Sequence, residues 1–300
     1  MRPLREAPGD PFVAFERAAE AAGRARAAVR AALPMDRAAA DLGVAGMIAG
    51  GALLVRGELP QRRALMNGLG AAFGLEPALV RTTPGMTAEE LREVRAARLS
   101  AGPPAPHRRP PLAHGLVLVE RLAEAAPAVR DLLFHVAAGG DVAGWLRPAT
   151  FTLLVTQPAA GLDPHEADRM LARIDLRDAA PGAFGRAVGS GDLHAAQVVA
   201  RTLPVGERVL AAALDVVRRA RPGDPEAPAA IAGTATRGPG PRAGQALLRL
   251  ARARALADGR LTPDLDDIRV LAPAVLAPRM GWRDEAAATT AMGALMETVA

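Results

Sequence analysis

Few side chains in this 300-residue sequence are of the types that usually perform covalent or metal chemistry. It has no cysteine and no lysine, which excludes thiolate nucleophiles, cysteine-bound metals, Schiff-base lysines and the lysine of a phosphate-binding P-loop. Ser100 and Ser190 lack the context of a nucleophile elbow. The histidines lack metal-ligand spacing, and His165-Glu166 has no second histidine at helical distance, so HExxH is absent. We therefore expect no metal site, and the remaining reactive groups are carboxylates and arginines.

The charge balance does not favour a nucleic-acid partner. The 37 basic residues, all of them arginine, exceed the 32 acidic ones by only five, and aromatic residues make up 3% of the chain. Stacking platforms for bases are therefore scarce. Arg24, Arg26 and Arg30 form a basic stripe on one predicted helix, but Glu16 and Glu20 accompany them, which is typical of a solvated helix face.

No segment of the sequence is long and apolar enough to predict a membrane span. The longest apolar run covers residues 42–55, whereas a span needs about 20 residues. The first six residues contain two arginines and a glutamate and lack the apolar region of a secretory signal. We expect a cytoplasmic protein.

Short apolar runs alternate with helical patterns in the first two thirds of the chain. The runs typical of buried parallel strands are 52–55, 116–119 and 151–155, with a weaker run at 79–81 and an edge strand at 172–176. Predicted helices cover 12–32, 36–48, 62–73, 88–99 and 127–138, and 101–111 is a proline-rich loop. This alternation predicts an α/β fold with a parallel sheet wrapped on both faces.

The last third of the chain has a different pattern. After about residue 204 the apolar periodicity is helical, over 207–219, 241–257, 264–275 and 284–300, with Gly259 and Pro278 as helix stops. We therefore divide the chain into an N-terminal helix (1–35), an α/β core (36–205) and an α-helical domain (206–300).

Several local runs occur in an order that is typical of one family. Gly50–Gly57 combines a glycine pair, an apolar strand and a further glycine, and Gly238–Ala243 places Arg242 after glycines and prolines. Between and after them stand Thr83–Met86, Pro110–Leu112, Val155–Gln157, Asp168–Leu171 and Thr262–Leu276. From about residue 45 to 280 the chain thus resembles the MoxR branch of the AAA+ ATPases. The resemblance implies a P-loop-type core with a five-stranded parallel sheet, followed by an all-α lid domain.

The run that would be the P-loop departs from the family pattern. Family members have GxxxxGK(S/T), and only Gly57 of that pattern remains in residues 57–64. Arg62 replaces the second glycine and crowds the phosphate cradle, Pro60 lacks an N–H donor, and Glu58 repels a triphosphate. Arg63 stands at the lysine position with a less suitable charge geometry, and Ala64 lacks the hydroxyl that would hold Mg²⁺. We expect a loop with the cradle's shape that no longer holds phosphate.

The other site residues that the resemblance implies are altered in part. The family's paired acids correspond to Glu120-Arg121, directly after the predicted strand at 116–119, so a cation replaces the catalytic carboxylate. A register slip by one residue would put Val119 at the metal-binding position and Glu120 at that of the base, and either register leaves one acid. Pro158 replaces the sensor asparagine. Arg169 and Arg242 match the family's inter-subunit arginine and lid arginine, although both could be ordinary solvated or ion-paired arginines.

These substitutions favour a pseudo-ATPase over an enzyme. The leading hypothesis is a non-catalytic scaffold or regulatory subunit of a chaperone-type complex, with no bound cofactor. The family resemblance implies as its partner an active AAA+ subunit in a mixed ring or a von Willebrand factor A-type protein. The alternative is an active, divergent ATPase that binds ATP and Mg²⁺ with Arg63 and Glu120. A nucleic-acid-binding module is the third hypothesis, and it predicts affinity that falls steeply with salt.

Overall fold

The computed structural model describes residues 10–34, 36–92, 110–140, 148–156, 162–177 and 182–299. Gln157, Pro158 and His107, the predicted loop at 101–111 except its last two residues, and the second half of the predicted helix at 88–99 lie outside these ranges. Among the described residues, no helix is long and apolar enough to cross a membrane.

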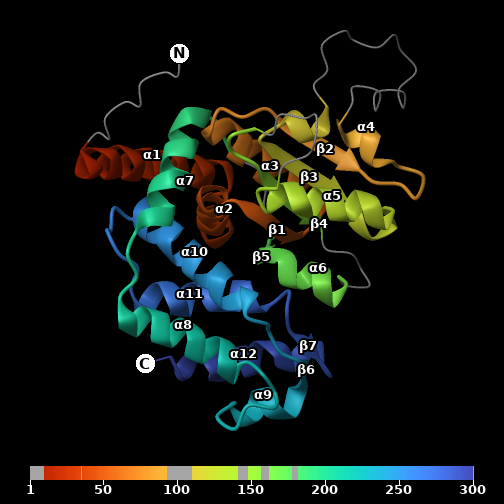
Figure 1. Ribbon diagram of the computed structural model, residues 1–300, viewed down its shortest axis with the longest axis vertical. Coiled ribbons are helices and arrows are strands. Elements are labelled where there is room, and N and C mark those ends of the chain that lie inside the picture. The colour runs from red at the N-terminus through yellow and green to blue at the C-terminus, as the bar shows by residue number, and fades with distance from the viewer. Residues whose placement is uncertain are drawn as a thin grey trace, which may run out of the picture.

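A five-stranded parallel sheet forms the centre of the core (Figure 1). Its order is β2-β3-β4-β1-β5, with strands β1 (Gly51–Arg56), β2 (Pro77–Arg81), β3 (Leu116–Glu120), β4 (Thr152–Thr156) and β5 (Met170–Asp175). All five predicted strands are present, and the strand predicted for the edge is the edge strand β5. The predicted α/β class with a five-stranded parallel sheet is confirmed.

Helices bury both faces of this sheet. Along β1, Leu53 and Val55 belong to the larger apolar cluster, whereas Ala52 and Leu54 belong to the smaller one on the opposite face. The larger cluster contains residues of α2 (Arg37–Ala49) and α3 (Leu59–Ala72), and the smaller contains residues of α4 (Ala88–Arg92), η2 (Pro111–Ala113), η3 (Leu122–Glu124) and α5 (Pro127–Ala137). Burial on both faces explains why these strands are continuously apolar.

Two further helices complete the larger layer. Helix α1 (Pro11–Ala32) contacts α2, α3 and α7 (Ser190–Thr202), and it buries alanines that allow close approach. Aspartates cap the start of several helices: Asp10, Asp36, Asp163 and Asp264 accept hydrogen bonds from amides in the first turns of α1, α2, α6 (Pro164–Arg169) and α11 (Leu265–Leu276). Such N-caps each contribute about 1 kcal/mol. Helices α6 and α7 were not predicted.

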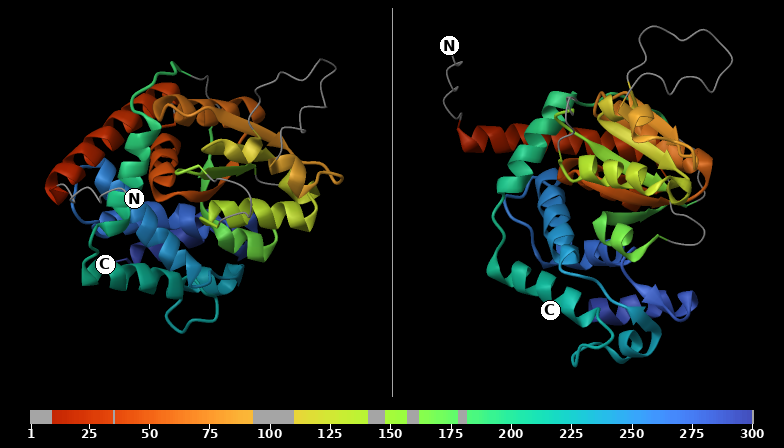
Figure 2. Two further views of the ribbon diagram at one scale, coloured as in Figure 1. Left: turned by 45° about the horizontal axis from the view of Figure 1, so that its top comes forward. Right: turned by 45° about the vertical axis from the view of Figure 1, so that its right-hand side comes forward.

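The C-terminal lid packs beside the edge strand β5 (Figures 1 and 2). Its helices are α8 (Glu207–Arg219), α9 (Ala229–Thr234), α10 (Arg242–Ala257), α11 (Leu265–Leu276), η4 (Glu285–Ala287) and α12 (Ala288–Glu297). The prediction that this part is all α is wrong in one detail, because β6 (Ala235–Arg237) and β7 (Gly281–Trp282) form a small antiparallel pair. The domain boundaries at 35 and 205 stay predictions.

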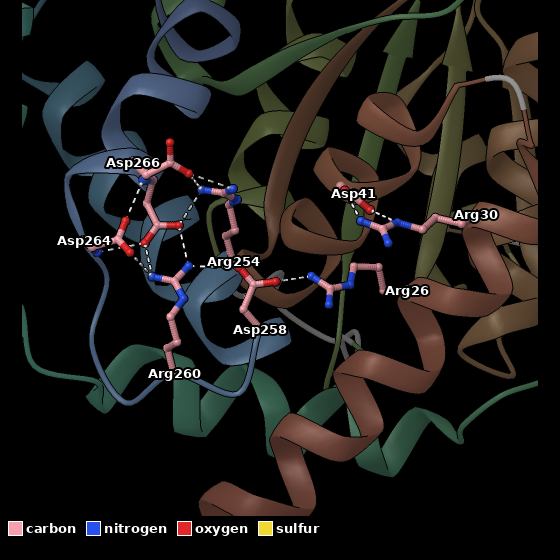
Figure 3. A network of polar contacts seen from close by, with 9 residues as sticks. Arg26, Arg30, Asp41, Arg254, Asp258, Arg260, Asp264 and Asp266 are labelled. Carbon is pink, nitrogen blue, oxygen red and sulfur yellow. Dashed lines mark hydrogen bonds and ion pairs between the residues drawn. The ribbon is translucent and has the colours of Figure 1, made fainter.

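Arginines and aspartates connect α1 to the lid (Figure 3). The carboxylate of Asp267 is fully buried and accepts hydrogen bonds from Arg254 and Arg260 at 2.8 Å. Arg260 also pairs with Asp258, which in turn pairs with Arg26 on α1. Burial raises the pKa of Asp258, but the hydrogen bonds from Arg26 and Arg260 outweigh it and hold that pKa below its ordinary value. The network therefore stabilises the folded lid against α1 above the pH at which Asp258 is protonated.

We predict that Asp267→Asn lowers the free energy of unfolding by about 3 kcal/mol, because it leaves two arginines facing a buried neutral amide. Urea unfolding followed by circular dichroism measures the change. Asp266→Asn is the matched control: its side chain is 63% exposed, and we expect a change within about 0.5 kcal/mol. Equal effects of the two substitutions would contradict the importance of the buried carboxylate.

Candidate functional site

The carboxyl ends of β1, β2 and β3 meet at one edge of the sheet, where an open α/β sheet usually binds its ligand. Glu120 is the last residue of β3, and Arg81, the last residue of β2, lies opposite it in the parallel register. Gly57 directly follows β1, and α3 begins two residues later. The predicted site residues Gly57, Arg62 and Glu120 are therefore brought together by the sheet.

Glu120 is buried and held by two arginines. Its side chain is 6% exposed, and Oε1 lies 3.4 Å from Nη2 of Arg62. Its Oε2 lies 3.2 Å from Nη2 and 3.3 Å from Nε of Arg81. Two guanidinium groups thus offset the cost of burying this carboxylate, which reaches several kcal/mol for an unpaired charge. Both carboxylate oxygens of Glu120 are thus engaged by guanidinium groups.

The connection from β1 to α3 does not have the shape of a phosphate cradle, so that expectation is wrong. Helix α3 begins at Leu59 with Pro60 in its first turn, which leaves only Gly57 and Glu58 between strand and helix. The Glu58 N–H donates to Oε1 of Gln61 at 2.6 Å, and the Arg62 N–H donates within the helix to the Glu58 carbonyl. Pro60 has no N–H. Of the backbone donors in this turn, those of Glu58 and Arg62 are therefore already bonded and position 60 has none.

Gly57 is required by close packing as well as by its backbone. Its φ is +150°, and a Cβ there would lie 2.8 Å from Cβ of Leu176 and 3.0 Å from Oε1 of Gln61. The glycine that matches the family pattern therefore serves a short strand–helix turn in this chain.

Residues 62–64 lie inside α3. Arg62 donates from Nη1 to the Gly57 carbonyl, so its guanidinium bridges the turn and Glu120. Arg63 is exposed and makes no ion pair within the described part of the chain. Ala64 is 4% exposed and packs in the larger apolar cluster. None of these three residues offers an oxygen ligand to a cation.

The residues on either side of Glu120 are held by packing and by hydrogen bonds within the protein. Val119 is fully buried in the smaller apolar cluster, so its position faces the core. Arg121 adopts the left-handed conformation with φ of 62°, alone among the described non-glycine residues, and its Nε donates to Glu124 at 2.7 Å. Thr82 donates from Oγ1 to the Arg121 carbonyl at 2.6 Å, which helps to hold this turn. A strained turn beside an acid is a feature of many functional sites.

Arg169 and Arg242 lie near the amino ends of β1 and β5, opposite the carboxyl ends where Glu120 lies. Arg169 directly precedes β5, which begins beside Ala52 at the start of β1. A strand rises by about 3.3 Å per residue, so the start of β1 at Ala52 lies about 16 Å from Gly57. Arg169 is 3.2 Å from a carboxylate oxygen of Asp131 and its guanidinium lies over the ring of Phe134, whereas Arg242 is 3.4 Å from Asp168. Both arginines line one small hollow.

A further arginine at the amino end of β5, Arg279, was not predicted from the sequence. Arg279, which follows α11, is 3% exposed and donates to the carbonyls of Val275 at 2.5 Å and Asp168 at 3.2 Å, and to that of Met170. Burial lowers its pKa to about 10, although nearby Asp168 opposes the shift. The side chain remains charged at neutral pH and joins the lid to the start of β5.

Within the described residues, no group of three His, Asp or Glu side chains could hold a metal ion.

We predict that Glu120→Gln lowers the free energy of unfolding by about 2 kcal/mol, because the part-buried Arg62 and the half-exposed Arg81 then lose their shared negative charge. Chemical denaturation of the two proteins at pH 7 measures this difference. Glu124→Gln, which changes a 38% exposed acid in the same turn, is expected to cost less than about 1 kcal/mol. A Glu120→Gln protein as stable as the unchanged one would show that the ion cluster contributes nothing.

Comparison with known proteins identifies the C-terminal part of the chain. Residues 227–298 match the family model of the AAA lid domain. No curated protein matches the sequence.

Solved structures are similar to the chain over nearly its whole length. A crystal structure described as that of a "putative ATPase" from Cytophaga hutchinsonii is 16% identical, with a TM-score of 0.73 over 97% of this chain and 96% of that one. A full-length MCM homologue from Methanopyrus kandleri is also 16% identical, with a TM-score of 0.54 over 94% of this chain and 65% of that one. At such low identity the likeness establishes the fold alone. The chain therefore has the fold of the AAA+ ATPases and carries an AAA lid domain in its C-terminal part.

Proposed function

We propose that this chain is a MoxR-like AAA+ protein that has lost nucleotide chemistry and acts as a scaffold or regulatory subunit of a chaperone-type complex. The observation that carries the proposal is the ion cluster of Arg62, Glu120 and Arg81 beside a two-residue β1–α3 turn. In an active site of this fold, that space holds the phosphates, a cation and a free acid.

The energetics favour the closed arrangement over nucleotide binding. A triphosphate would have to displace Arg62 from Glu120 and from the Gly57 carbonyl. Removing a partner from a buried ion pair costs about 3–5 kcal/mol. Losing a general base lowers turnover by a further 10²–10⁴-fold, roughly. Together these costs support negligible hydrolysis.

The attachment of the lid supports a fixed scaffold. Arg279 joins the lid to backbone carbonyls at the start of β5, and Arg26 of α1 pairs with Asp258 at the end of α10. Helix α10 also packs on α1, α2 and α7. A lid that is bonded both to the start of β5 and to α1 has little freedom to rotate when a ligand binds.

The partners follow from the family resemblance and from the position of two arginines. Arg169 is 42% and Arg242 is 60% exposed at the edge opposite Glu120. An arginine presented by one subunit can stabilise phosphoryl transfer in the site of its neighbour. An active AAA+ subunit in a mixed ring is therefore the first partner to test, and a von Willebrand factor A-type protein the second.

We predict that isothermal titration with Mg·ATP gives no saturable heat that depends on Arg63 or Glu120. The alternative, a divergent ATPase that uses Arg63 and Glu120, requires saturable binding. At 100 times its Kd the ligand would also stabilise the protein by about 2.7 kcal/mol. Saturable binding that Arg63→Gln weakens, while Arg208→Gln in the exposed face of α8 does not, would contradict the proposal.

We also predict that Arg169→Ala lowers the ATPase rate of an active AAA+ partner in the mixed complex by at least tenfold, because the transition state loses a positive charge. Steady-state turnover of the reconstituted complex measures the effect. Arg24→Ala, which removes an exposed arginine of α1, is the control and should leave the rate unchanged. If both variants support the full rate, Arg169 has no role in the partner's site.

A further inference from the structure

A cavity of about 430 Å³ lies at the amino ends of β1 and β4, away from the Glu120 cluster. Its walls come from the ends of α2 and α5 and from α7 and α10, and in Figure 1 α2, α7 and α10 lie beside one another. Three arginines line it: Arg201 from α7, and Arg249 and Arg252 from α10. Apolar lining comes from Ile48 and Phe151.

The charges around this cavity are unbalanced. Among the described residues that line it, none is an aspartate or a glutamate. Sixteen other arginines of the described chain form ion pairs with acids, from Arg24 in α1 to Arg279 after α11. The three arginines of the cavity have no such partner in the described residues, as is also true of Arg63, so no described acid offsets their charge at this site.

Backbone contacts hold two of these guanidinium groups in place. Arg249 donates from Nη2 to the carbonyls of Ala49 at 2.8 Å and Gly50 at 2.6 Å. Arg252 donates from Nε to the Leu203 carbonyl at 2.8 Å. Each therefore caps a helix end with part of its guanidinium and keeps further N–H donors, since arginine has five. The geometry is preorganised before any ligand arrives.

Helix capping explains only part of this positive charge. The C-terminal ends of α2, α5 and α7 each carry about half a negative charge, so three helix ends offset about half of three arginines. Arg201 has no partner among the described residues, yet it lies near enough to affect Arg249. Burial lowers the pKa of Arg249, and the charge of Arg201 lowers it further. Such repulsion between two arginines is relieved when an anion lies between them.

We propose that this cavity binds a small phosphate monoester, with Arg201, Arg249 and Arg252 on the phosphate and the apolar wall on the organic group. Planar guanidinium groups match the geometry of phosphate oxygens and bind them in pairs. The volume lies within the range of small-ligand sites and exceeds what phosphate alone would fill. This site is separate from the nucleotide site, and the proposal does not depend on the proposed function.

The test is calorimetry with inorganic phosphate, phenyl phosphate and phenol at constant ionic strength. We expect saturable one-site binding of phenyl phosphate, weaker binding of inorganic phosphate and no binding of phenol. Tighter or equal binding of inorganic phosphate would identify the free ion as the ligand and overturn the monoester. No saturable heat with either phosphate would overturn the site itself.

Matched variants assign the binding to the cavity. Arg201→Gln should weaken phenyl phosphate binding at least tenfold, and its thermal midpoint should stay unchanged, because this exposed side chain holds no backbone group. Arg208→Gln removes an equally exposed arginine outside the cavity and should change the affinity less than twofold. Equal weakening by both variants would overturn the proposal in favour of general charge attraction. Heat from ATP that Arg201→Gln abolishes and Arg63→Gln does not would belong to this cavity and leave the proposed function intact.

Discussion

The burial of one carboxylate, that of Glu120, constrains the whole edge of the sheet where this fold usually holds its ligand. A carboxylate with its side chain 6% exposed needs compensating charge, and Arg62 and Arg81 supply it. Because Arg62 also bonds the Gly57 carbonyl, the ion cluster ties the end of β3 to the β1–α3 turn. In the proposed function, the same interaction that stabilises the core also occupies the space that phosphates would need.

The substitutions at this edge are physically coupled. An arginine at position 62 is incompatible with a glycine-lined cradle but compatible with a helix that begins at Leu59. Once the helix begins there, its first amides bond within the turn and the acid has a cation beside it. At the opposite edge, unpaired arginines gather around a cavity without a described acid.

Much of the fold could be predicted from the sequence, since continuous apolar runs such as 52–55 that alternate with helical patterns are typical of a parallel sheet buried on both faces. Helix α8 was predicted with the bounds that the structure has, because Glu207–Arg219 has a clear helical period. The start of α3 was missed, although Pro60 in a first turn is a helix-start signal. Reading residues 57–64 as a loop concealed that signal. Strands β6 and β7 are too short to leave a period.

The site was predictable in its residues but not in its contacts. Glu120 and Arg62 could be named from their positions, whereas Arg81 became a partner only through the register of β2 with β3. Arg279 joins the start of β5 from more than 100 positions away, which no local pattern indicates. The most direct test of the central claim is a crystal structure grown with Mg²⁺ and a non-hydrolysable ATP analogue. We expect Arg62 to remain on Glu120 with no triphosphate beyond β1, and triphosphate density between Gly57 and Arg63 would contradict the account.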